Sequence, residues 1–436
     1  MSEFNYYRSL VAGSESYIPL KNGKYVKAIN LDNAATTPPF HSVLDEIIKF
    51  SPFYSSIHRG YGYKSELSSY IYDTSRYIVK DFVGASSTDT VIYVKNTTEA
   101  INKLSNRLCY ERDSVVLSTD MEHHSNDLPW RKNFKVDYIE LDQFGGLSLK
   151  SLEEKLRKYK DKIKLVTVTG ASNVTGIINP IHYIAEIVHK HNIKLLVDGA
   201  QLVPHCPISM KSTAKDKNDC IDYLVFSAHK MYAPFGIGVL IGPKSTFDYG
   251  NPDCVGGGTV KLVTHNFIEW DDPPAKEEGG SPNIIGVVAL VASIKTLNQI
   301  SMDKVYSQES YLTEYTLEML KSLPEARIYG DTTLNNRLGI ISFDLKDIPH
   351  QVVGRALACE GGISVRTGCF CAQPYIQKLL NISNTEIMKY INKSSSRPGL
   401  VRISHGIYNI PQEIDRTYEL LKKIIKNKAY YLDKFK

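Results

Sequence analysis

The sequence predicts an α/β protein with two domains, and three observations carry that prediction. Between residues 90 and 245, short β-branched apolar runs alternate with helical patterns, which is typical of a mostly parallel sheet covered by helices on both faces. The chain has 436 residues, more than one compact core holds. Beyond residue 296 the pattern changes to longer helices and strands of mixed burial. We therefore expect a large domain over 31–295 and a smaller α+β domain formed by 1–30 and 296–436.

The individual elements follow from apolar periodicity and turn residues. In the large domain the pattern predicts helices at 98–108, capped by Asn96, Thr97 or Thr98, and at 180–191. Predicted strands lie at 91–94, 115–118, 164–169, 193–198, 223–227 and 238–242. In the smaller domain we expect helices at 303–322 and 351–360, strands at 339–343, 363–365 and 400–403, and a loop at 393–399. The first 30 residues carry no strong pattern and are expected to pack on this domain.

Composition and charge exclude several classes of protein. Lysine and arginine exceed acidic residues by 52 to 47 and are scattered, which disfavours nucleic-acid binding. The longest apolar runs, such as 284–294, are too short for a membrane span, and the N-terminus lacks a signal-peptide pattern, so we expect a cytoplasmic protein. Seven cysteines, an odd number, indicate reduced thiols. No cysteine or histidine pairs stand at zinc spacing, so we expect no metal.

A lysine and an acid follow two neighbouring predicted strands. Lys230 closes the string Ser227-Ala-His-Lys230, and Asp198 opens the string Asp198-Gly-Ala-Gln201. Pyridoxal phosphate (PLP) requires this set, because a lysine binds it covalently, an acid faces its pyridine nitrogen, and polar donors hold its other groups. Gln201 would reach the ring oxygen. Taken alone, Lys230 could be a solvated surface lysine and Asp198 a helix-capping aspartate. The combination of the two favours a PLP site.

Further polar residues complete this candidate site. Thr97 and Thr98 open a predicted helix, whose first N–H groups and dipole favour an anion such as a phosphate, although a simple helix cap is compatible with the same residues. Ser227 and His229 add side-chain donors. His123 is a candidate to stack on the cofactor ring, and a loop histidine with satisfied contacts is the alternative.

Two arginines and a cysteine point to an amino-acid substrate. Arg402 follows a predicted loop, and its planar guanidinium suits an α-carboxylate; Arg366 is a less specific rival, and an exposed surface position is the ordinary alternative for both. Cys371 lies in a polar loop punctuated by Gly368 and Pro374. A cysteine on such a loop near an arginine favours a reactive thiolate over an inert buried thiol.

Together these motifs resemble the class V, fold type I PLP enzymes, specifically the cysteine desulfurase and selenocysteine lyase group. The strings at 122–126 and 278–283 and the short cysteine loop are similar to the SufS-like group II members. The resemblance spans nearly the whole chain, through residues 31–37, 96–102, 122–126, 172–179, 197–201, 227–230, 278–283, 366–374 and 402–409.

Two positions depart from the pattern of this family. Ala228 stands where the family often has glycine, which is a small change. Cys369 and Phe370 stand where group II members usually have two histidines or similar residues, and the string Arg366-Thr-Gly-Cys-Phe-Cys371 resembles the desulfurase-like domain of molybdenum cofactor sulfurases. This departure leaves the sulfur acceptor open.

The resemblance implies a fold, a reaction and a set of roles. It implies a mainly parallel seven-stranded sheet in the large domain, a PLP cofactor and a homodimer. The reaction would convert L-cysteine to L-alanine and pass the sulfur, as a persulfide on Cys371, to a protein acceptor. The implied catalytic residues are Lys230, Cys371 and His123. The implied cofactor contacts are Lys230, Asp198, Gln201, His123, Thr97, Thr98, Asn173, Ser227, His229 and, from the neighbouring subunit, Ser281, and the implied substrate contacts are Asn173, Arg402, Asn33 and Arg366.

Other functions remain open at this level. Within the family these are selenocysteine lyase, molybdenum cofactor sulfuration, and an amino-acid lyase or epimerase that does not use Cys371. Outside it, a scaffold protein without PLP is the alternative, which the intact set of Lys230, Asp198 and phosphate donors disfavours. Cys369 has three interpretations: a spectator, a relay that receives the persulfide, or a partner in a strained disulfide with Cys371.

Overall fold

A mixed sheet forms the centre of the large domain in the computed structural model, which describes residues 3–109, 113–215, 217–392 and 398–435. The strand order is β4-β10-β9-β8-β7-β5-β6, with β10 antiparallel to both neighbours and the remaining pairs parallel. The predicted mainly parallel seven-stranded sheet is confirmed. Its strands are β4 (Asp89–Val94), β5 (Val115–Thr119), β6 (Lys135–Ile139), β7 (Ile163–Thr169), β8 (Lys194–Asp198), β9 (Tyr223–Ser227) and β10 (Gly238–Pro243).

The central strands are apolar because helices cover both faces of the sheet. In β9 every residue is buried, and in β8 only Lys194 at its start is exposed. The edge strand β6 is half-buried and carries Lys135 and Asp137, which is why its apolar pattern did not predict it. The helices of the large domain are α2 (His41–Phe50), α3 (Tyr63–Phe82), α4 (Thr97–Leu108), α5 (Leu128–Asn133), α6 (Leu149–Tyr159), α7 (Ile181–His189), α8 (Leu202–His205), α9 (Lys244–Asp248) and α10 (Ile284–Ile300).

The smaller domain is built on an antiparallel sheet with the order β13-β14-β17-β16. Its strands are β13 (Ala326–Tyr329), β14 (Ile340–Leu345), β16 (Arg366–Gly368) and β17 (Leu400–Ser404). Its helices are α11 (Met302–Lys321), α12 (His350–Ala356), α13 (Gln373–Leu379), α14 (Asn384–Ile391), α15 (Pro411–Lys426) and α16 (Lys428–Phe435). It has an apolar core of its own, around Ile341, Phe343 and Val401. Most of the predicted loop at 393–399 lies outside the described residues.

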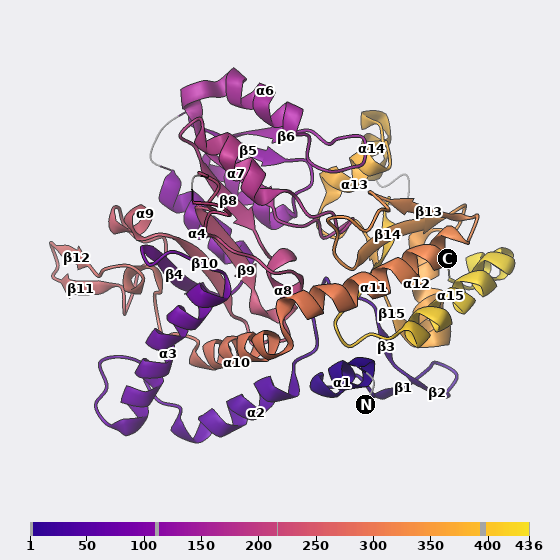
Figure 1. Cartoon of the computed structure of the whole chain (residues 1–436), viewed down its shortest axis with the longest axis horizontal. Helices are drawn as coiled ribbons and strands as arrows, with labels where there is room; N and C mark the ends of the chain where they lie inside the picture. Colours follow the sequence, from indigo (N-terminus) through magenta and orange to yellow (C-terminus); the bar gives the residue numbers. More distant parts are fainter. Residues whose placement is uncertain (1–2, 110–112, 216, 393–397, 436) are drawn as a thin grey trace.

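The chain passes between the domains through two consecutive long helices. Residue 295, the expected end of the large domain, lies inside α10, which packs against α2 and α3 and ends at Ile300. The chain turns at Ser301, and α11 then leads to the smaller domain (Figure 1). No single helix in the described part of the chain is long and apolar enough to cross a membrane. In the same part of the chain, α10 and α11 together have the length and apolar composition of a membrane span, but the chain bends by 77° between them.

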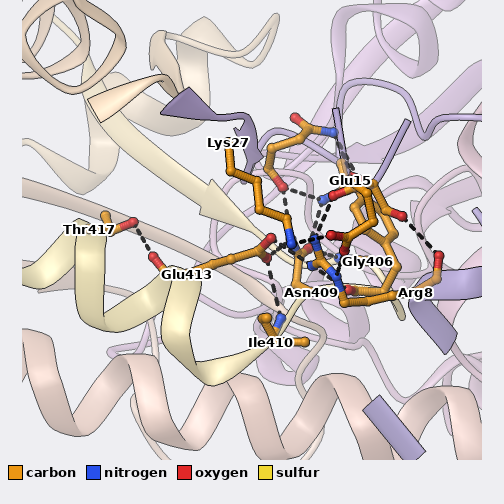
Figure 2. Close-up of polar contacts among 12 residues, drawn as sticks. Arg8, Glu15, Lys27, Gly406, Asn409, Ile410, Glu413 and Thr417 are labelled. Carbon is orange, nitrogen blue, oxygen red and sulfur yellow. Dashed lines mark hydrogen bonds and ion pairs between the residues drawn. The ribbon is translucent and has the colours of Figure 1, made fainter. Parts of the chain in front are cut away.

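The N-terminal segment is tied to the C-terminal part of the chain. It forms α1 (Glu3–Leu10), a hairpin of β1 (Tyr17–Pro19) and β2 (Tyr25–Lys27), and β3 (Ile29–Asn30), which pairs with β15 (Ile363–Ser364) of the smaller domain. Arg8 is buried and donates to the Glu413 carboxylate at 2.7 Å and to the Tyr408 carbonyl at 3.1 Å (Figure 2). A guanidinium therefore joins the two ends of the chain.

Replacing Arg8 should destabilise the protein strongly. Arg8→Met leaves the Glu413 carboxylate buried without its cation, and breaking a buried pair in this way costs about 3 kcal/mol or more. Urea unfolding measures the loss. Lys27→Met is the matched control, because Lys27 pairs with Glu15, whose side chain is 64% exposed, and such a pair contributes below about 1 kcal/mol. Equal midpoints for the two variants would contradict the assigned role of Arg8.

Candidate active site

A cavity of about 330 Å³ opens where β7, β8 and β9 end. Carboxyl ends of parallel strands meet at one edge of a sheet, so the loops that follow them share this cavity. Of the residues that the sequence analysis proposed for the site, all but Asn33 and Ser281 line it. The lining residues are Ala34, Ala35, Asn96, Thr97, Thr98, His123, Ser125, Thr169, Ala171, Asn173, Asp198, Ala200, Gln201, Ser227, His229, Lys230, Arg366, Phe370, Cys371 and Arg402.

Lys230 and Asp198 are brought together by the pairing of β8 with β9. In that register Asp198 lies opposite Val225, and one 3₁₀ turn after β9 carries Lys230 back toward the acid. Burial lowers the pKa of Lys230 to about 8, although Asp198 acts in the opposite direction. Burial also raises the pKa of Asp198. The Ala200 N–H, which donates to Asp198 Oδ1 at 2.9 Å, partly opposes that rise. The cavity therefore holds an amine that loses its proton near physiological pH beside a buried acid.

Two histidines on the cavity wall are neutral. Burial, together with the Lys230 ammonium, lowers the pKa of His123 to about 3 and that of His229 to about 4. The Ser125 N–H donates to His123 Nδ1 at 3.1 Å, so the ring carries its proton on Nε2. An uncharged, oriented imidazole of this kind can lie against a cationic aromatic ring.

Hydroxyl and N–H groups cluster where α4 begins. Asn96 caps the helix, and its side chain accepts from the Glu99 N–H at 3.0 Å. The Thr97 N–H donates to Ser227 Oγ at 2.8 Å, and the Thr98 and Ser125 hydroxyls lie 2.7 Å apart. The start of this helix of 12 residues lines the cavity together with the Ser125 and Ser227 hydroxyls, and its N-terminal dipole favours an anion such as a phosphate there.

Arg402 also lines the cavity and is 3% exposed. It donates to the Asn173 carbonyl at 2.9 Å and to Asp32 Oδ1 at 3.0 Å. Burial lowers its pKa to about 10, so it stays charged at neutral pH. Arg366 also pairs with Asp32, at 3.0 Å, but its side chain is half exposed. The buried Arg402 is therefore the stronger candidate for a substrate carboxylate.

Sequence reasoning missed the acid that holds both arginines. Asp32 stands in the 31–37 string, where only Asn33 was proposed for the site. Asn33 does not line the cavity, in contrast to the prediction that it contacts the substrate. Its fully buried side chain donates to the Ser404 carbonyl at 3.0 Å and accepts from the Tyr408 hydroxyl at 2.8 Å. Asp32 directly follows Leu31 in a short apolar segment, and an acid in that position was the signal that could have identified it.

Ser281 lies away from this cavity. It is exposed and borders a second, larger hollow of about 1130 Å³, which is also lined by Arg59 and Lys80. This position neither supports nor excludes the expected contact with a neighbouring subunit, which stays a prediction.

The cysteine loop approaches the cavity in an unusual backbone conformation. Phe370 and Cys371 both have positive φ, 51° and 55°. The His124 N–H donates to the Cys371 carbonyl at 2.7 Å, and the exposed Cys371 borders the cavity. The Cys369 thiol donates to the Pro398 carbonyl at 3.1 Å instead, and none of the cysteines forms a disulfide.

The donor set fits a planar, phosphorylated aromatic cofactor better than a metal ion. Within the described ranges, no group of three or more His, Cys, Asp or Glu side chains is arranged to hold a metal. Gln201 lines the cavity with a buried Oε1 that has no partner there, while its Nε2 donates to the Ala34 carbonyl at 2.7 Å. This buried oxygen on the cavity wall is an acceptor that a donor group of a bound ligand would satisfy.

Comparison with known proteins places this site in a family. Residues 29–417 match the model of the aminotransferase class-V family. A probable cysteine desulfurase from Halalkalibacterium halodurans is 33% identical over 92% of this chain and 94% of its own, and a cysteine desulfurase from Haloferax volcanii is 32% identical over 90% and 88%. The apo structure of a cysteine desulfurase from Thermococcus onnurineus NA1 has a TM-score of 0.81 at 30% identity, covering 92% of this chain and 95% of that chain. The chain therefore belongs to the class V aminotransferase family.

Proposed function

We propose that this chain is a PLP-dependent cysteine desulfurase, which converts L-cysteine to L-alanine and carries the sulfur on Cys371 to an acceptor protein. The main support is one observation: an amine of lowered pKa, a buried acid, a buried guanidinium and an exposed thiol border the same cavity. The names of the relatives agree with it. A cytoplasmic location and the group II subtype stay predictions.

The residues of the cavity fit PLP from one end to the other. Lys230 would bind its aldehyde carbon, and the Asp198 carboxylate would face the pyridine nitrogen. The start of α4, with Thr97, Thr98, Ser227 and His229, would hold the phosphate, and His123 would cover one face of the ring. When bound, PLP supplies an electron sink for the electron pair left at the substrate α-carbon.

The protein side chains then divide the reaction between them. Arg402 binds the substrate carboxylate, because its buried guanidinium keeps its charge. Lys230 takes the α-proton, since its lowered pKa makes the neutral amine available near pH 8. The Cys371 thiolate attacks the substrate sulfur, and the bond between that sulfur and the β-carbon breaks. The sulfur remains on Cys371 as a persulfide, and the electron pair of the broken bond lets the β-carbon take up a proton. Lys230 returns a proton to the α-carbon, so that alanine leaves.

A homodimer is part of the proposal. Ser281 is exposed at the border of the large hollow, on a surface where Tyr54 and Tyr77 are also exposed. A second copy that covered this surface would bury those tyrosines, whose large apolar rings favour interfaces.

The pH dependence of cofactor capture should report the lowered pKa of Lys230. Only the neutral amine attacks the aldehyde, so the rate at which apo-protein captures PLP should rise from pH 6.5 and level off above about pH 8 to 9. Stopped-flow absorbance measures it. An unshifted lysine, with a pKa near 10.4, would instead give a rate that grows about tenfold per pH unit up to pH 10. Lys230→Ala should lose the absorbance band of lysine-bound PLP, whereas the exposed Lys295→Ala should keep it.

Cys371→Ser should separate cofactor binding from sulfur transfer. The variant keeps the PLP absorbance and binds cysteine, but it loses persulfide formation and releases alanine at least about a hundredfold more slowly, because a hydroxyl cannot replace the thiolate as nucleophile toward sulfur. Mass spectrometry and an alanine assay measure both effects, with Cys109→Ser, an exposed thiol, as the control. Wild-type alanine release from cysteine in Cys371→Ser would exclude Cys371 as the nucleophile. Activity retained on selenocysteine alone would favour a selenocysteine lyase.

Sedimentation of the holoenzyme tests the homodimer. We expect a single species of twice the 49.0 kDa of one chain at micromolar concentration. Tyr77→Glu, which places a charge on the surface that a second copy would bury, should shift that species toward the monomer, whereas the exposed Tyr430→Glu on α16 should not. A wild-type protein that stays a monomer would exclude a contribution of Ser281 from a second subunit.

A further inference from the structure

We propose that Phe370 is a positioning residue that holds the Cys371 thiol at a set place relative to the substrate carboxylate. The proposal rests on the desulfurase function above and adds to it a residue to which no role has been assigned. It is carried by a closed set of three contacts between the cysteine loop and the carboxylate-binding wall of the cavity.

The three contacts join residues from three separate parts of the chain. Arg402 on β17 donates through Nη1 to the Asn173 carbonyl at 2.9 Å. Asn173, in the loop after β7, donates through Nδ2 to the Phe370 carbonyl at 2.7 Å. The Phe370 ring returns to Arg402, with its centroid 4.9 Å from the guanidinium carbon. Each member therefore contacts the other two.

The cysteine loop needs such a constraint. Two consecutive residues other than glycine, Phe370 and Cys371, adopt left-handed backbone conformations, which persist only where surrounding contacts hold them. The His124 N–H holds the Cys371 carbonyl, and Asn173 holds the Phe370 carbonyl. Phe370 is 8% exposed and belongs to the apolar core of the large domain, so its burial adds an apolar contact to these two hydrogen bonds.

The aromatic character of Phe370 matters because its partner is a cation. A guanidinium over an aromatic ring is attracted by the electrons of the ring face, and the attraction is stronger away from water. The ring lies over the Arg402 guanidinium, and both residues line the cavity in which a substrate carboxylate would bind. Arg402 and the second N–H of the Asn173 side chain would hold the substrate. Because both residues contact Phe370, the position of the substrate relative to the Cys371 thiol is then set. An aliphatic side chain could fill the space but would not hold the guanidinium.

The experiment compares the Phe370→Leu and Phe370→Tyr holoenzymes with the wild type. In Phe370→Leu we expect hydrogen–deuterium exchange at least about tenfold faster in peptides that contain His124 and Ala372, whose amides donate to the carbonyls of Cys371 and Cys369. Alanine release from cysteine should fall about tenfold in kcat, with less than a threefold change in KM and an unchanged PLP absorbance. Phe370→Tyr keeps the ring and should behave as the wild type in both measurements.

Phe134→Leu is the matched control, because it removes a ring that is 9% exposed from another part of the large domain. It should leave the exchange of both peptides and the kcat unchanged. Unchanged exchange in Phe370→Leu overturns the proposal, and so does faster exchange with an unchanged kcat. A wild-type enzyme that releases no alanine from cysteine overturns the desulfurase function instead, while the exchange data still decide whether Phe370 holds the loop.

If Phe370→Leu does not fold, Asn173→Ala provides a second test, because it removes the contact with the Phe370 carbonyl. It should give the same rise in exchange, and unchanged exchange in this variant overturns the proposal.

Discussion

The parallel pairing of β8 with β9 is the constraint on which the rest of the site depends. Asp198 lies opposite Val225, and the hydrogen bond from the Gly199 N–H to the Val225 carbonyl, at 2.8 Å, extends the pairing past the end of β8. Both strands are buried on both faces, so a shift of one residue would exchange the two side-chain faces and place Asp198 away from the cavity. The single turn after Ser227 has a fixed length, and the register therefore determines where Lys230 meets the acid.

Removal of water determines the protonation states that this arrangement requires. Burial favours the uncharged form of every titratable group, yet the groups respond differently because their neighbours differ. His123 and His229 lie near the Lys230 ammonium and become firmly neutral, whereas Arg402 remains a cation because Asp32 compensates part of its desolvation. The cavity thus concentrates its charge on a few groups and surrounds them with neutral donors. This distribution suits a ligand that carries both a phosphate and a carboxylate.

The smaller domain does more than cover the cavity. It contributes Arg402 from β17 and the cysteine loop from the segment after β16, while Asp32 arrives from the N-terminal part of the chain. Polar contacts continue this connection: Arg8 donates to Glu413, and Glu413 accepts from Asn409 (Figure 2). Asn409 in turn accepts from Asn33. The next residue, Ala34, holds Gln201 through its carbonyl. The first residues of the chain are thereby connected to the wall of the site.

The sequence alone determined the α/β class, most strands of the large sheet and the residue types of the cofactor site, because these depend on local apolar patterns and on motifs of neighbouring residues. Asp198, Lys230 and Cys371 could be selected in this way. It did not predict β6, whose edge position tolerates polar residues, nor α10, which continues to Ile300 past the expected end of the large domain at residue 295. Only the tertiary structure decided that Asn33 is a buried structural residue, that Asp32 holds two arginines and that Phe370 contacts Arg402. These pairs lie tens to hundreds of positions apart, and no local pattern encodes a contact that forms only when two domains close around one cavity.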